Sequence, residues 1–307
     1  MRTLKRYAVS LGYPLGIGPE ILAKAMAEAP TAEWVLFGDE AVIATAFRRW
    51  AKRTPPGQKT TIVSVGPSAA IDPMGAQRAS LDTAVNAVLE GSCAALVTAP
   101  MLREPGARGH TELLATRTGG REAAMLMEAD GLRVALATVH VPLRDVPKRL
   151  SPQGIASVSR LLATYLEGVL HQKVPRLALL GLNPHNDAGP VTRHAAVREN
   201  ALLADAVLAA RKAGVDLRGP LPADALFASR AKGYQGVVAL YHDQGLIPAK
   251  LLAGHAALNV TLGLPFARVS PGHGIALDIA GRGVASPRGM IAAMSFIPLL
   301  AARWPWN

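Results

Sequence analysis

Three histidines in this chain follow apolar runs, and imidazoles placed in this way are typical of a metal site. They are His140 after residues 134–139, His185 after residues 177–182, and His242 after residues 237–241. Imidazole is a common ligand of zinc and other transition metals, and α/β folds place their chemistry where buried strands end. Any one of the three would alone be read as a hydrogen-bonded loop residue, and the chain has no HExxH or CxxC motif. Their shared context indicates a joint role.

A glycine-rich turn lies between the first apolar run and the first helical segment. Gly16 and Gly18 form a G-x-G pattern ahead of Pro19, and such turns let backbone N–H groups approach a phosphate at a helix N-terminus. The third glycine of the dinucleotide fingerprint is absent. The pattern therefore predicts either a dinucleotide site at Gly16 and Gly18 or a tight turn with Pro19 in the first helical position.

The sequence GHTE at residues 109–112 precedes another predicted helix. His110 and Thr111 could donate hydrogen bonds to an anion at the N-terminus of that helix. The simpler alternative is that Thr111 caps the helix.

The elements that would position these residues alternate between strands and helices. Apolar, β-branched runs predict strands over residues 7–11, 34–37, 61–65, 93–97, 132–139, 176–182 and 237–241. Amphipathic or capped segments predict helices that include residues 20–28, 80–89, a segment from Ser151 to Val169, 195–213 and 287–303. Residues 67–77 and 219–224 are predicted loops. This alternation predicts a mainly parallel sheet with helices on both faces.

Composition narrows the class of protein. At 307 residues, half of them hydrophobic, the chain is long enough for a large core. The net charge of +11 comes from scattered basic residues, so an anionic substrate and cofactor are expected rather than a nucleic acid. The single cysteine, Cys93, excludes an intramolecular disulfide and a cysteine-based zinc site. No signal sequence or membrane-spanning run is visible, and we expect a cytoplasmic protein.

Seven motifs, in order along nearly the whole chain, resemble the 4-hydroxythreonine-4-phosphate dehydrogenase family of pyridoxal phosphate biosynthesis. They are GIGPE at 16–20, TAP at 98–100, GHTE at 109–112, HVPLRD at 140–145, LNPH at 182–185, YHDQG at 241–245 and TLGLP at 261–265. The resemblance implies a three-layer α/β/α fold similar to isocitrate and isopropylmalate dehydrogenases. It implies one unit, residues 1–307, of two interleaved α/β subdomains with an active-site cleft between them.

The resemblance also implies the site residues, motif by motif. A divalent metal would be held by His140, His185 and His242, contributed by both subunits of a homodimer with a shared active site. Asp224 would face the substrate amino group. The residues that match the family's phosphate site are His110, Thr111, Lys250, Asn259 and Arg268.

The implied reaction is oxidation of 4-phosphohydroxy-L-threonine by NAD or NADP. The product is a β-keto acid that loses carbon dioxide to give an amino ketone phosphate. The metal, which could be zinc, cobalt, magnesium or manganese, would act as a Lewis acid on the substrate hydroxyl. Lys250 and Arg268 would neutralise the substrate anion, and Asp243 or a metal-bound water would be the general base.

The chain departs from the family pattern at Tyr13, Leu102, Arg103, Gly272 and Ile275. These departures leave open a related dehydrogenase that acts on another phosphorylated hydroxy acid, such as threonate or erythronate 4-phosphate, or on an aromatic dihydrodiol acid. A non-catalytic anion-binding protein on the same scaffold is the third alternative.

Overall fold

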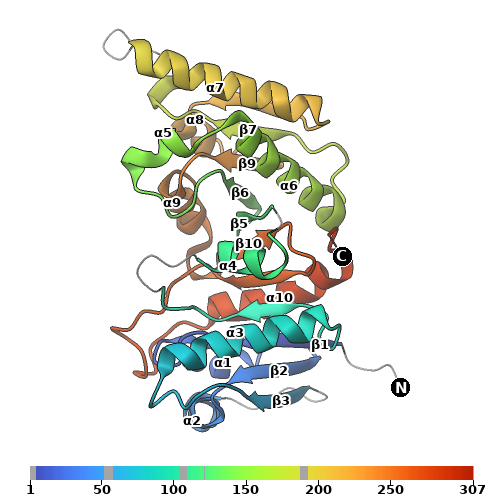
Figure 1. Ribbon diagram of the computed structural model, residues 1–307, viewed down its shortest axis with the longest axis vertical. Helices are drawn as coiled ribbons and strands as arrows, with labels where there is room; N and C mark the ends of the chain where they lie inside the picture. Colours follow the sequence, from blue (N-terminus) through green and yellow to red (C-terminus); the bar gives the residue numbers. More distant parts are fainter. Residues whose placement is uncertain (1–4, 52–57, 104–108, 121, 187–192, 307) are drawn as a thin grey trace. The chain divides into compact units, whose positions relative to one another are not determined.

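The computed structural model of this chain describes residues 5–51, 58–103, 109–120, 122–186 and 193–306. The chain folds into two compact units that alternate along the sequence (Figure 1). Unit 1 consists of Met1–His110, His255–Val260 and Pro265–Asn307, and unit 2 consists of Thr111–Gly254 and Thr261–Leu264. Each unit combines strands with covering helices, so the predicted α/β class is confirmed.

Unit 1 is built on strands in the order β3-β2-β1-β4-β11-β10. The pairs are parallel except for β10 with β11. Helix α3 packs on β1 and β2, α10 packs on β4 and β11, and α1 packs against α2 and α10. The elements are β1 Arg6–Ser10, α1 Gly18–Ala25, β2 Glu33–Gly38, α2 Glu40–Trp50, β3 Lys59–Ser64, α3 Pro73–Leu89, β4 Leu96–Thr98, η3 Gly254–Ala256, β10 Leu258–Leu262, β11 Arg268–Pro271 and α10 Arg288–Arg303.

Unit 2 is built on strands in the order β5-β6-β9-β7-β8, parallel except for the β5–β6 pair. Both α6 and α9 pack on β6 and β9, and they lie to either side of β6 in Figure 1. The elements are α4 His110–Arg117, β5 Ala124–Ala129, β6 Leu132–Leu136, η1 Leu143–Asp145, α5 Val146–Arg149, α6 Pro152–Leu170, β7 Leu177–Leu180, η2 Pro184–Asn186, α7 Arg193–Lys212, β8 Leu217–Leu221, α8 Ala223–Ala228, β9 Gly236–Ala239 and α9 His242–Ala253.

Helix signals in the sequence act as predicted. The Ser151 hydroxyl accepts a hydrogen bond from the backbone N–H of Gly154 at the start of α6, with a proline in the first turn. Ile155 and Tyr165 of α6 are buried. Gly214 follows α7 with a φ of 83°, which is the left-handed conformation that ends helices.

Two local predictions are wrong. Helix α3 begins at Pro73, inside the predicted loop 67–77, because Asp72 caps it by accepting from the backbone N–H of Gly75. Residues 217–221 form strand β8 rather than the start of a stiff loop, and β8 lies at a sheet edge, where proline is tolerated. Residues 242–253, for which no element was predicted, form helix α9, although they contain Pro248. No helix in the described residues is long and apolar enough to cross a membrane.

Candidate active site

The three predicted metal ligands follow three neighbouring strands of unit 2. Strand β9 pairs in parallel with β6 on one side and with β7 on the other. His140 follows β6, His242 is the first residue of α9 after β9, and His185 lies in η2 after β7. Because parallel strands end at the same edge of a sheet, all three residues are delivered to one edge of unit 2.

His140 and His242 lie close together, with ring centroids 6.0 Å apart. With metal–nitrogen bonds of about 2.0–2.1 Å, two imidazoles that share one ion have centroids roughly 5–6.5 Å apart, so this pair fits an ion. His185 has a left-handed backbone, with φ 57° and ψ 1°. Within the described residues of the chain, no group of three or more His, Cys, Asp or Glu side chains is arranged to hold an ion. The structure thus brings two of the predicted ligands together.

Each of these two histidines faces a carboxylate. The Nδ1 of His242 lies 2.6 Å from Oδ1 of Asp243. The Nδ1 of His140 lies 3.8 Å from Oε1 of Glu112, on the first turn of α4. Both imidazoles are about one third exposed, at 36% of each side chain, so a ligand can reach them.

Gln244, for which no role was predicted from the sequence, fixes the start of α9. Its Oε1 accepts from the backbone N–H of Leu240 at 2.7 Å, and its Nε2 donates to the carbonyl of Gly181 at 2.8 Å. This side chain therefore ties the ends of β9 and β7 to the turn that carries His242. Gly245 lets α9 approach β6, since a Cβ there would lie 2.8 Å from a methyl of Val134.

A second polar cluster lies in unit 1, around Arg268. This guanidinium is fully buried and donates to the hydroxyl of Thr98 at 3.1 and 2.5 Å. Burial lowers the pKa of Arg268 to about 9. Burial and then the charge of Arg268 hold the pKa of His110 well below its usual 6.5.

Two buried polar atoms near this cluster have no hydrogen-bond partner among the described residues: Nε2 of His110 and Oδ1 of Asn259. Asn259 pairs with Ser270 across the antiparallel β10–β11 ladder, so it shares a face with Arg268, two residues along. A buried cation beside a neutral imidazole and orphaned polar atoms is an arrangement that an anion would complete.

The remaining predicted residues lie on other elements. Thr111 is buried in the first turn of α4. Asp224 is exposed in the first turn of α8, after β8. Lys250 is exposed in the last turn of α9, about 12 Å along the helix from His242 at 1.5 Å per residue.

The glycines predicted to bind the cofactor, Gly16 and Gly18, lie where β1 turns into α1. Two backbone N–H groups of this turn already donate hydrogen bonds within the protein. Gly16 N–H donates to the carbonyl of Tyr13, and Ile17 N–H donates to the carbonyl of Ile275, both at 3.0 Å. A Cβ on Gly18 would lie 2.6 Å from the carbonyl oxygen of Leu11, so this glycine permits close backbone packing.

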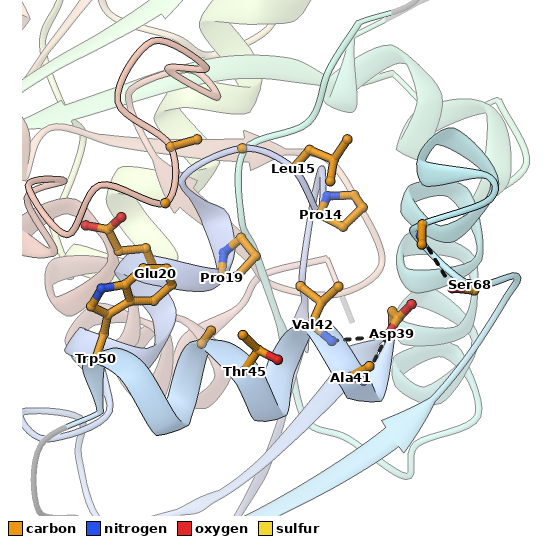
Figure 2. Close-up of a pocket in the computed structure, with 15 residues that line it drawn as sticks. Pro14, Leu15, Pro19, Glu20, Asp39, Ala41, Val42, Thr45, Trp50 and Ser68 are labelled. Atoms are coloured by element: carbon orange, nitrogen blue, oxygen red, sulfur yellow. Dashed lines mark hydrogen bonds between the residues drawn. The ribbon is translucent and has the colours of Figure 1, made fainter.

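A cavity of about 390 Å³ opens beside this turn (Figure 2). It lies past the ends of β1 and β2, where α/β sheets bind ligands. Its walls come from the β1–α1 turn, α2, the segment before α3 and residues 280–281, and they include Leu15, Gly16, Val42 and Trp50. The Asp39 carboxylate caps α2 at one side by accepting from the backbone N–H groups of Ala41 and Val42.

A buried ion pair anchors the segment that completes the cavity. Glu20 is 1% exposed and accepts from Lys24 Nζ at 2.7 Å and from the backbone N–H groups of Gly283 and Ala285. Lys24 Nζ in turn donates to the carbonyls of the same two residues. Glu20 is the last residue of the GIGPE motif, so part of that motif's role is structural.

Comparison with known proteins agrees with this architecture. The family model "Pyridoxal phosphate biosynthetic protein PdxA" matches residues 33–297. The 4-hydroxythreonine-4-phosphate dehydrogenase of Roseobacter denitrificans is 39% identical over 96% of this chain and 97% of its own length. The enzyme of the same name from Chromobacterium violaceum is 37% identical over 96% of each chain.

Solved structures give the same result. The 4-hydroxythreonine-4-phosphate dehydrogenase of Klebsiella pneumoniae superposes with a TM-score of 0.81 at 32% identity, covering 97% of this chain and 99% of that one. A terephthalate 1,2-cis-dihydrodiol dehydrogenase from Burkholderia xenovorans gives 0.63 at 28% identity, covering 97% and 98%. An isocitrate dehydrogenase from Methylococcus capsulatus, at 0.50 and 16% identity over 99% and 87%, shares the fold. From the family match and these near-full-length similarities, the chain belongs to the PdxA family of pyridoxal phosphate biosynthetic proteins.

Proposed function

We propose that this protein is a metal- and NAD(P)-dependent dehydrogenase that oxidises 4-phosphohydroxy-L-threonine to a β-keto acid, which then loses carbon dioxide. The observation that carries the proposal is the His140–His242 pair at the ends of adjacent parallel strands. Relatives over nearly the full length of the chain carry the name of this enzyme.

His140 and His242 would hold the divalent ion, with His185 as the third ligand. When bound, such an ion supplies Lewis acidity at the substrate hydroxyl, and a nicotinamide supplies the hydride acceptor. The proposal includes a homodimer that shares its sites, as the resemblance to the family implies.

Arg268, His110 and Asn259 would bind the phosphate of the substrate. Arg268 supplies a buried positive charge, and Nε2 of His110, which has no partner among the described residues, would donate to a phosphate oxygen. Thr111 and Lys250, expected at the same phosphate, and Asp224, expected at the amino group, stay predictions from the family resemblance.

The cavity at the ends of β1 and β2 would take part of the cofactor. Its volume of about 390 Å³ lies within the range of small-molecule sites, and Gly16, predicted for the cofactor, lines it. The apolar side chains of Leu15, Val42 and Trp50 suit a planar ring such as adenine better than a phosphate.

An aromatic dihydrodiol acid is the second candidate substrate, because Tyr13 and Ile275 depart from the family pattern. Both lie against the β1–α1 turn, where Tyr13 accepts from Gly16 and Ile275 accepts from Ile17. A neighbour with 28% identity is named as a dehydrogenase of an aromatic dihydrodiol. The buried charge of Arg268 favours a phosphorylated substrate over that alternative.

The decisive test is reduction of NAD and of NADP by purified protein, followed at the nicotinamide absorbance. Each of 4-phosphohydroxy-L-threonine, threonate 4-phosphate, erythronate 4-phosphate and a cis-dihydrodiol acid would be offered separately. Turnover with the first that is lost on chelation and restored by zinc, cobalt or manganese is the expected result. Turnover with another substrate alone moves the assignment to the second candidate, and no turnover with any, together with no bound metal, removes the enzyme proposal.

Matched histidine variants distinguish loss of the metal site from loss of folding. His140→Ala should lose both metal and turnover, whereas His171→Asn should keep both, because His171 caps the far end of α6 in a left-handed conformation that asparagine tolerates. If the sites are shared, mixing inactive His140→Ala and His185→Ala chains should restore part of the turnover.

A further inference from the structure

The two paired histidines present the same nitrogen to a carboxylate. In both rings Nδ1 is the atom nearest the acidic group, at 2.6 Å from Asp243 for His242 and at 3.8 Å from Glu112 for His140. The first distance is that of a short hydrogen bond, and the second is an electrostatic contact beyond hydrogen-bond range. From the sequence, Asp243 was predicted to be catalytic, and no role was predicted for Glu112.

A carboxylate at Nδ1 decides which nitrogen of a neutral imidazole carries the proton. The proton sits on Nδ1, where it is donated to the acceptor, and the lone pair of Nε2 is then free for a ligand. In metal sites such partners also fix the orientation of the ring. Asp243 is well placed for this because it directly follows His242 in the first turn of α9.

We propose that Asp243 and Glu112 are positioning residues that hold His242 and His140 with Nε2 directed to a shared divalent ion, an inference that rests on the proposed function. Asp243 acts through a formed hydrogen bond, whereas Glu112 acts through charge at longer range. Of the two carboxylates, Asp243 therefore has the larger role in positioning.

The two helices that carry these carboxylates also serve the rest of the proposed site. Glu112 lies on α4, two residues after His110, and Nε2 of His110 is one of the buried atoms without a partner among the described residues. Asp243 is next to Gln244, which ties α9 to the ends of β9 and β7. A shift in the first turn of α4 or of α9 would therefore move the carboxylate of Glu112 or of Asp243 relative to its histidine.

The first test is the tautomer of each histidine in the metal-free protein, read from nitrogen chemical shifts in long-range ¹H–¹⁵N spectra at a pH where the rings are neutral. Wild type should show His242 protonated on Nδ1. Asp243→Ala should shift His242 toward the form protonated on Nε2, and Asp243→Asn should largely keep the wild-type form, because the amide oxygen still accepts the hydrogen bond. An unchanged tautomer in Asp243→Ala would overturn the proposal.

The second test is zinc affinity, measured by competition with a chromophoric chelator, together with the visible spectrum of the cobalt-loaded protein. We expect Asp243→Ala to weaken zinc binding about 10–100-fold, Glu112→Gln to weaken it less, and both to alter the cobalt spectrum. Asp205→Ala and Glu167→Gln, which change exposed carboxylates on α7 and α6, should leave both unchanged. Full zinc affinity in Asp243→Ala with loss of turnover would instead make Asp243 the general base.

The tautomer and zinc measurements distinguish failure of the positioning role from failure of the proposed function. If wild type binds no metal, the metal dependence of the proposed function is refuted, while the tautomer experiment still tests the contact between Asp243 and His242. If wild type binds metal but the Asp243→Ala tautomer and affinity are unchanged, only the positioning role falls. Asp243 is 72% exposed, so its replacement is not expected to disturb folding, and a thermal unfolding curve checks this.

Discussion

Replacing Arg268 by methionine should stabilise the ligand-free protein and abolish its response to phosphate. Burial lowers the pKa of this guanidinium from 12.5 to about 9. At 1.36 kcal/mol per pKa unit, holding the charge in place costs roughly 5 kcal/mol when no anion is bound. Methionine has a similar length and no charge, so the variant avoids this cost, although the groups that Arg268 contacts, the Thr98 hydroxyl among them, lose their donors, at ~1–3 kcal/mol.

The balance is a gain of about 2–4 kcal/mol in the free energy of unfolding, within the range found when buried ion pairs are replaced by apolar groups. The assay is thermal unfolding with and without inorganic phosphate. Wild type at a phosphate concentration 100 times its Kd should gain about 2.7 kcal/mol, whereas Arg268→Met should start from a higher Tm and gain nothing.

The matched control is Arg218→Met, which removes an exposed arginine paired with Asp216 and should leave stability nearly unchanged. A variant of Arg268 that is less stable than wild type and still responds to phosphate would refute the reasoning. It would mean that the charge is satisfied within the folded protein and that phosphate binds elsewhere.

Three further predictions concern the other clusters. Burial, and then the charge of Arg268, lower the pKa of His110 below its unfolded value of about 6.5. The unfolded state therefore binds more protons, and the stability of the ligand-free protein should fall as the pH drops below about 6.5. Tm measured from pH 7 to pH 5 should show this fall in wild type, and His110→Gln should make it smaller. Trp50 lines the cavity, so ADP or NADH should quench its fluorescence, and Trp50→Phe should remove the change. Gln244→Leu leaves two backbone groups without their partners, and should lower the free energy of unfolding by about 1–3 kcal/mol and weaken zinc binding.

The sequence was most informative where a local pattern and the global fold agree. Apolar runs that end in histidine predicted three strands, and the structure places these strands side by side with their carboxyl ends at one edge. The Ser151 cap and the glycine after α7 were also readable, because capping depends on residues next to each other in the chain.

Other features depend on tertiary contacts and left no local signal. Helix α9 contains Gly245 and Pro248, which disfavour a helix, and Gly245 is needed for close packing on β6. The contact of Glu112 with His140 was not visible from spacing, since the two residues are 28 positions apart. The link from Gln244 to Gly181 likewise joins two strands that are distant in sequence.

The strand order of unit 1 has a consequence for how the protein is made. Strand β11, from the last fifth of the chain, pairs with β4 from the first third, and α10 packs on both. During synthesis the first 110 residues must therefore wait, with one side of β4 unpaired, until nearly the whole polypeptide has left the ribosome. Most of unit 2 is continuous, from Thr111 to Gly254, and can fold first. Until β11 pairs with it, that side of β4 is an unpaired strand edge at which nascent chains can associate.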